Sequence, residues 1–81
     1  EDNKLITPEK FTENKEMKRL IKQVLYELPD QEKKVLVLYY YEELTLREIG
    51  LILKVSESRI SQIHTKAIAH MRVKLKRVLG R

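Results

Sequence analysis

A pair of helical patterns separated by about three residues constrains the fold of this chain more than any other feature. The segment TLRE at 45–48 has the form of a capping box and predicts the start of a short helix over 46–53. Ser56 is a favourable N-cap and predicts a long helix over 57–79, followed by Gly80. Two helices joined by such a turn predict a helix-turn-helix over about residues 45–66, with an ordinary helical hairpin as the alternative.

Apolar residues in the two segments are spaced so that the helices can pack across each other. On the long helix, one stripe should be core: Ile60, Ile63, Ala67, Ile68, Met71 and Leu75. On the short helix we expect burial of Leu46, Ile49 and Leu53, with Leu51 or Ile52 as a further candidate. Gly50 is small where the helices would approach closely, and Lys54 occupies the turn position where glycine is usual.

Two more helices are predicted before this unit. Apolar residues at helical spacing, from Met17 to Leu28, predict a helix over 13–27 that ends before Pro29. Pro29 is suited to the first position of a second helix, over 29–41, which is apolar on all sides. That helix is either a central core helix with exposed tyrosine edges or a docking surface for a partner protein.

The predicted fold is therefore all-α, with four helices in residues 13–81. Residues 1–12 are polar and are predicted to be a tail or linker, in which Thr7-Pro8 could open a first turn. Charge is distributed unevenly over the 81 residues. Residues 1–44 carry ten acidic and eight basic side chains, whereas residues 45–81 carry two acidic and nine basic ones, a net of +7. A basic half of this kind indicates a polyanion-binding surface, although a solvated basic face is the alternative.

Several function classes are excluded by the composition. The chain has no cysteine, and therefore no disulfide, thiolate nucleophile or Cys-based zinc site. It has no glycine-rich phosphate loop, and His64 and His70 point too far apart around a helix to share one metal ion. The longest apolar run, over 35–41, is too short to span a membrane. We expect a non-enzymatic piece of a larger cytoplasmic protein that needs no cofactor.

The long helix also predicts a DNA-reading surface opposite its core stripe. This face is short and polar, unlike a charged solvated surface, and it suits the major groove. The candidate base-reading residues are Glu57, Ser58, Ser61 and Gln62. Gln62 could pair with an adenine edge and Glu57 could accept from a cytosine amino group.

Other residues are suited to holding the DNA backbone. Free N–H groups at the start of the short helix favour a phosphate, as do nearby cations and hydroxyls. The candidates are Thr45, Leu46, Arg47, Arg59, Thr65 and Lys66. A basic run follows at Arg72, Lys74, Lys76 and Arg77. It either extends the phosphate contacts, meets a neighbouring protein, or only complements the helix dipole.

The motifs over residues 8–78 resemble region 4 of bacterial RNA polymerase sigma factors of the sigma-70 family. The resemblance rests on Leu28-Pro29, Tyr39-Tyr40, the segment ELT at 43–45, the segment EIG at 48–50, and RISQI at 59–63. The string SESRISQIH at 56–64 is most similar to the flagellar branch.

The resemblance implies that the helix-turn-helix reads the −35 promoter element. It places base reading on Glu57, Ser58, Ser61 and Gln62. Primary sigma factors usually have arginine at the positions of Glu57 and Ser61 and glutamate at that of Ser58. These departures indicate an alternative sigma factor with an A/T-rich element.

The resemblance also implies partners: the β-flap of the RNA polymerase core, an anti-sigma factor, and activators at positions matching Lys66 and Arg72. A third position that matches an activator contact of the family is Ala69 in this chain, whose short apolar side chain departs from the cations at the other two. Two alternatives stay open on the residues alone. One is the DNA-binding domain of a response regulator, and the other is a helical module that binds an acidic protein.

Overall fold

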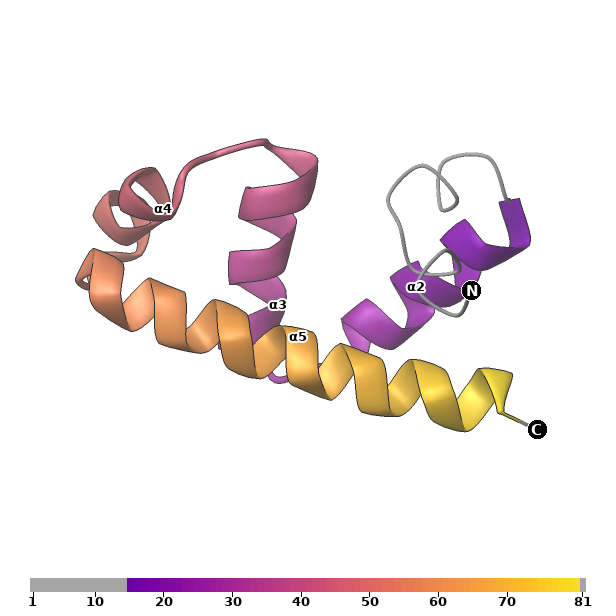
Figure 1. The fold of residues 1–81 in the computed structure, drawn as a ribbon. Helices are drawn as coiled ribbons and strands as arrows, with labels where there is room; N and C mark the ends of the chain where they lie inside the picture. Colours follow the sequence, from indigo (N-terminus) through magenta and orange to yellow (C-terminus); the bar gives the residue numbers. More distant parts are fainter. Residues whose placement is uncertain (1–14, 81) are drawn as a thin grey trace.

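The computed structural model describes residues 15–80, which form helices joined by short turns (Figure 1). In chain order these are α2 (Lys15–Tyr26), α3 (Asp30–Leu36), the π-helix η2 (Val37–Tyr41), α4 (Leu46–Leu53) and α5 (Glu57–Leu79). Within these residues there is no strand, and the predicted all-α class is confirmed. The predicted tail at 1–12, with its turn at Thr7-Pro8, lies outside the described residues.

The long helix α5 is the scaffold of the molecule. Figure 1 shows α4 crossing its N-terminal end, α3 rising from its middle, and α2 lying beside its C-terminal half. The five most deeply buried side chains of α5 fall on one stripe, as predicted: Ile60, Ile63, Ala67, Met71 and Leu75. Ile68, predicted to share this stripe, is only partly buried at its edge.

This stripe serves two separate hydrophobic clusters. The first holds the helix-turn-helix together and consists of Val35, Ile49, Ile60 and Ile63. The second joins α2 and α3 to the C-terminal half of α5 and consists of Val24, Leu25, Leu28, Leu36, Ala67, Met71 and Leu75. Because Val35 and the adjacent Leu36 lie in different clusters, α3 is buried on two sides. This explains why apolar residues occur on two sides of the chain where α3 ends, although the first five residues of α3 are polar or charged.

The predicted helix over 29–41 differs from the structure in two respects. Pro29 is the N-cap of α3, with ψ of 149°, and not its first helical residue. After Leu36 the helix widens into η2, where the N–H of Glu42 donates to the carbonyl of Val37 at 3.2 Å, five residues back. Tyr40 and Tyr41 are exposed there, which agrees with a core helix that has exposed tyrosine edges.

On α4 one prediction was wrong. Ile49 and Gly50 are buried and Leu46 and Leu53 pack against the first cluster, but Leu51 and Ile52 are 73% and 54% exposed. The reason is geometric: a two-turn helix lying on α5 covers one stripe, and residues 51 and 52 fall outside it.

A buried polar contact between α3 and α5 was not foreseen. Glu32 is only 6% exposed, and its Oε1 lies 2.7 Å from Nδ1 of His70 on α5. The two residues are 38 positions apart, so no local sequence signal joins them. The contact satisfies a carboxylate that would otherwise be costly to bury.

Candidate nucleic-acid interface

The turn between α4 and α5 fixes how the two helices are presented. The N–H of Val55 donates to the carbonyl of Gly50 at 3.0 Å, and Lys54 adopts the left-handed conformation with φ of 63°. This is a Schellman motif, in which Val55 folds back onto the apolar cluster around Ile49. A Cβ on Gly50 would lie 2.8 Å from the carbonyl oxygen of Val55, so no larger residue fits without moving the turn.

Both helices begin at the predicted caps. Thr45 and Glu48 form the complete capping box: the N–H of Thr45 donates to Glu48 Oε1 at 2.9 Å, and the N–H of Glu48 donates to Thr45 Oγ1 at 3.1 Å. The Ser56 hydroxyl accepts from the N–H of Arg59 at 3.0 Å. At the start of α4, the N–H groups of Leu46 and Arg47 find no acceptor among residues 15–80 and remain available to an external anion.

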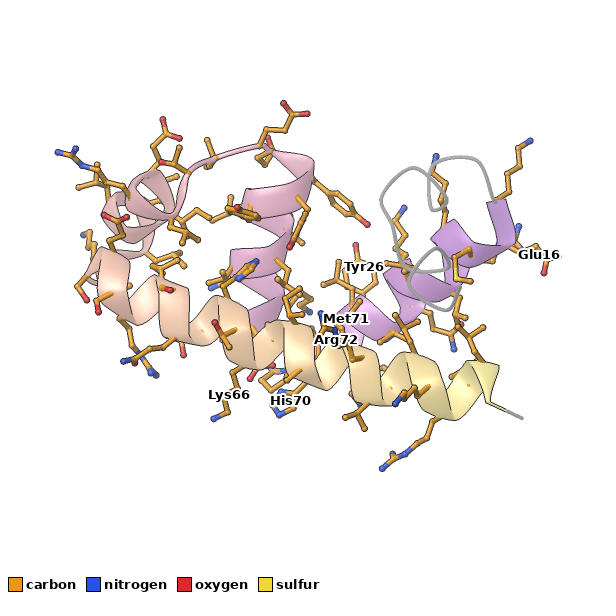
Figure 2. The ribbon with its side chains drawn as sticks, in the orientation of Figure 1. Glu16, Tyr26, Lys66, His70, Met71 and Arg72 are labelled. Atoms are coloured by element: carbon orange, nitrogen blue, oxygen red, sulfur yellow. The ribbon has the colours of Figure 1, made fainter. Side chains whose placement is uncertain are left out.

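The predicted reading face of α5 lies on the solvent-exposed side of the helix. All the candidates on this helix are exposed: Glu57, Ser58, Arg59, Ser61, Gln62, Thr65 and Lys66. Figure 2 shows Lys66 on the side of α5 opposite α4. The guanidinium of Arg59 lies 3.5 Å from Oε1 of Gln62, a long contact that directs the amide oxygen toward the cation. Donors and acceptors are therefore presented on a rigid helix, as major-groove reading requires.

The charge around this face is positive. Glu57 is the only acidic residue of α5, which also carries six Lys or Arg residues: Arg59, Lys66, Arg72, Lys74, Lys76 and Arg77. Of these only Lys74 has an acidic partner among the described residues, Glu27 at 3.7 Å. A row of exposed cations without counter-charges is the electrostatic footprint of a nucleic-acid surface.

With this geometry in place, comparison with known proteins identifies the family. The profile of Sigma-70, region 4 matches residues 24–73, more than half of the chain. The chain belongs to the sigma-70 region 4 family. The match runs from Val24 at the end of α2 to Val73 on α5, and so includes the whole helix-turn-helix.

Named sigma factors are similar to this region 4 chain. The RNA polymerase sigma factor FliA of Escherichia coli strain K12 is 49% identical over 59 residues, which cover 73% of this chain and 25% of that protein. The RNA polymerase sigma-D factor of Bacillus subtilis is 41% identical over 78 residues, which cover 96% of this chain and 31% of that protein. The chain thus spans about a quarter to a third of the length of these relatives.

Family membership decides between the readings left open by the residues. Region 4 is a DNA-binding domain of a transcription factor and is not catalytic, so the chain is not an enzyme. The sigma interpretation is favoured over the response-regulator domain and over the acidic-partner module.

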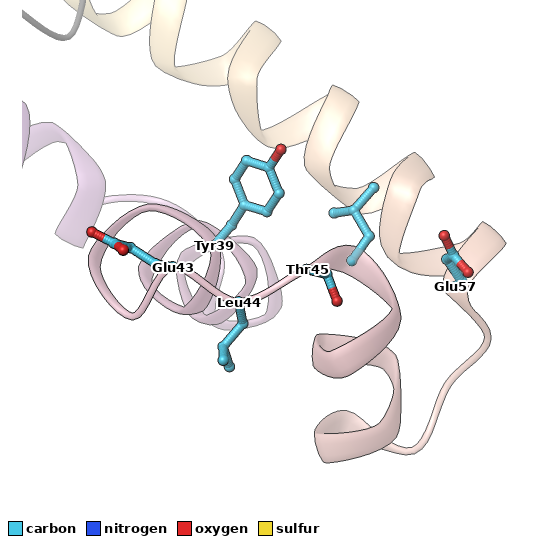
Figure 3. Close-up of a pocket in the computed structure, with 6 residues that line it drawn as sticks. Tyr39, Glu43, Leu44, Thr45 and Glu57 are labelled. Atoms are coloured by element: carbon cyan, nitrogen blue, oxygen red, sulfur yellow. The ribbon is translucent and has the colours of Figure 1, made fainter.

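In this region 4 domain, a shallow hollow lies between η2, the loop at 42–45 and the start of α4 (Figure 3). It is lined by Tyr39, Glu43, Leu44, Thr45, Leu46 and Glu57. Figure 3 shows the carboxylates of Glu43 and Glu57 on opposite sides of Leu44 and Thr45. Two carboxylates and no cation line the hollow, so a phosphate would not be held inside it.

An aromatic contact behind the reading face escaped the sequence analysis. The hydroxyl of Tyr40 on η2 shares a hydrogen bond of 3.1 Å with Nε2 of His64 on α5, and the two rings stack with centroids 5.8 Å apart. Partial burial lowers the pKa of His64 from its usual value of 6.5, which favours the neutral imidazole. The partners are 24 residues apart, and no local sequence signal could have joined them.

Two further features are absent from residues 15–80. No three His, Asp or Glu side chains in this part of the chain come together in a way that could hold a metal ion. None of its helices has the length and apolar character required to cross a membrane.

Proposed function

We propose that this region 4 domain reads the −35 promoter element for an alternative sigma factor of the flagellar type, and so helps direct RNA polymerase to its promoters. One observation carries the proposal: the first three turns of α5 present short polar side chains, flanked by exposed cations, on a helix-turn-helix of this family. The similarity to FliA and sigma-D factors supports the choice of branch.

Base reading is assigned to the first turns of α5. Glu57, Ser58, Ser61 and Gln62 are all exposed there. Gln62 is the adenine reader, because a glutamine amide can donate to N7 and accept from the N6 amino group of adenine. The contact with Arg59 leaves the second lone pair of the Gln62 oxygen available, so it is compatible with this pairing.

Backbone contacts are assigned to residues on both helices. The free N–H groups of Leu46 and Arg47, next to the capped Thr45, form one phosphate site at the positive end of α4. Arg59, Thr65 and Lys66 flank the reading face on α5 and hold the adjacent strand. Such contacts set the register of the helix without carrying sequence information.

The proposal includes protein partners and a cellular place. The domain spans residues 13–81 and acts in the cytoplasm, at the nucleoid. In its active state it binds the β-flap of the polymerase core. In its inactive state it is bound by an anti-sigma factor instead. Exposed apolar side chains on two elements support such docking: Tyr40 and Tyr41 on η2, and Leu51 and Ile52 on α4.

Fluorescence anisotropy with labelled duplexes tests the DNA-reading role. The chain is titrated against an A/T-rich −35-like duplex and a shuffled duplex of equal composition, each at two salt concentrations. We expect tighter, salt-sensitive binding to one duplex, because base contacts add to the electrostatic attraction. Equal affinity for both duplexes would contradict sequence reading by this chain.

A further inference from the structure

The outward face of α5 continues well beyond the residues assigned to base reading. At ~100° per residue, Arg72, Lys76 and Arg77 lie within about 80° of Gln62 around the helix, on the side opposite the buried stripe. All three are exposed. The reading face and these cations therefore form one continuous surface along the helix.

Within residues 15–80, none of the three cations has an acidic partner. Lys74, the other basic residue of this segment, is half-buried and pairs with Glu27 of α2 at 3.7 Å. Among residues 15–80 no carboxylate pairs with Arg72, Lys76 or Arg77. The lysine that pairs with α2 is thus separate from the cations that α5 presents outward.

Cations gather along this face in the direction of the C-terminus. Arg59 accompanies the serines and Gln62 in the first turns, Lys66 follows, and the last turns carry Arg72, Lys76 and Arg77, with the short side chains of Ala69 and Val73 between them. A helix of 23 residues is ~34 Å long, whereas the major groove is ~12 Å wide and curves around the duplex. Because α5 is straight (Figure 1), a helix that touches base edges at its N-terminus must leave the groove further along. Outside the groove, the DNA groups nearest to the helix are backbone phosphates, and long cationic side chains can extend to them.

We infer that Arg72, Lys76 and Arg77 bind backbone phosphates of the duplex that flanks the −35 element on one side. This inference rests on the proposed function, since it extends the same interface. Three observations favour DNA over an acidic protein as the partner of this segment. They are its continuity with the reading face, the lack of counter-charges among residues 15–80, and the gathering of cations toward the end of α5.

The salt dependence of binding measures these contacts directly. The plot of the logarithm of the association constant against the logarithm of the salt concentration has a negative slope. In the triple variant R72Q/K76Q/R77Q this slope should become shallower by about two to three, since each phosphate contact contributes about 0.9. If the two proteins bind equally at 1 M salt, this corresponds to a loss of affinity of roughly a hundred- to a thousandfold at 100 mM salt. A matched control, K15Q/K18Q/K22Q, removes the same charge from exposed positions on α2 and should lower the slope by less than one. Equal slope changes in both variants would overturn the inference, because they would show only a general charge effect.

The effect of duplex length distinguishes a local phosphate contact from non-specific electrostatic attraction, because non-specific attraction does not depend on which side of the site is trimmed. Trimming the duplex close to the −35-like site on one side should lower its affinity for the native chain, and trimming it on the other side should leave the affinity unchanged. The triple variant should bind the long and both trimmed duplexes equally. The variant R72K/R77K, which keeps the charge, should behave as the native chain. Native binding that is indifferent to trimming on either side would contradict the flanking contact and indicate a protein partner.

The outcomes separate this inference from the proposed function. If the native chain prefers the −35-like duplex but the triple variant is unchanged, the flanking contact is wrong and the reading role stands. If the native chain shows no preference, or no binding at low salt, both are overturned.

Discussion

Lys54, in the turn of the helix-turn-helix, adopts a backbone conformation that is unfavourable for a residue with a side chain. Its φ of 63° is the left-handed region, where a Cβ is unfavourable by roughly 1–2 kcal/mol. Replacing Lys54 with glycine should raise the free energy of unfolding by about 0.5–1 kcal/mol, since the greater entropy of glycine in the unfolded chain offsets part of the gain. Chemical denaturation measures this. Lys54→Ala is the control, because it removes the charge and keeps the Cβ; an equal gain in both variants would contradict the explanation.

His64 makes the stability of the domain depend on pH. Its pKa is lowered in the folded state by burial, so the unfolded chain binds a proton more readily. The contribution of His64 is therefore fully present above about pH 6.5 and is lost as the pH falls below that value. In urea denaturation, the midpoint urea concentration of the native chain should fall as the pH is lowered from 7 to 5. The midpoint of His64→Gln should change less over the same range. Parallel profiles for the two proteins would rule out His64 as the source.

At the scale of elements, Gly50 sets the distance between α4 and the turn that leads into α5. A methyl group there would lie 2.8 Å from the carbonyl oxygen of Val55 and 3.5 Å from the N–H nitrogen of Glu57. Gly50→Ala should destabilise the domain by about 1–3 kcal/mol despite the better helix propensity of alanine, because backbone must move. It should also weaken DNA binding, since α5 is displaced relative to α4.

Leu51→Ala is the matched control for this change. Leu51 lies on the same helix and is 73% exposed, so its replacement should alter the free energy of unfolding by less than about 0.5 kcal/mol. Thermal unfolding of both variants gives the comparison. A Gly50→Ala protein as stable as the native chain would show that the turn can open without cost.

Local signals predicted the elements that have local causes. The capping box at Thr45, the N-cap at Ser56 and the break at Lys54 gave the bounds of α4 and α5 as the structure has them. The widening of the helix at η2 was not predictable, because it arises where one helix packs into two clusters at once. The exposure of Leu51 and Ile52 likewise depends on which side of α4 faces α5.

At the scale of the whole molecule, one helix has two duties. One stripe of α5 organises both hydrophobic clusters, and the opposite side presents the candidate DNA surface. The periodicity of 3.6 residues per turn was sufficient to divide α5 into these sides, so the exposed candidate site could be predicted from sequence. The contacts of Glu32 with His70 and of Tyr40 with His64 could not, because each joins residues that only the tertiary fold brings together.

The central claim is that the outward face of α5 reads DNA sequence, and the ratio of affinities for the −35-like and shuffled duplexes tests it most directly. In Gln62→Ala this ratio should fall five- to a hundredfold, or about 1–3 kcal/mol, because a base contact is lost. Lys66→Ala should weaken both complexes about equally and keep the ratio, with the salt slope reduced by about 0.9. A Gln62→Ala chain that keeps the native ratio would contradict the account.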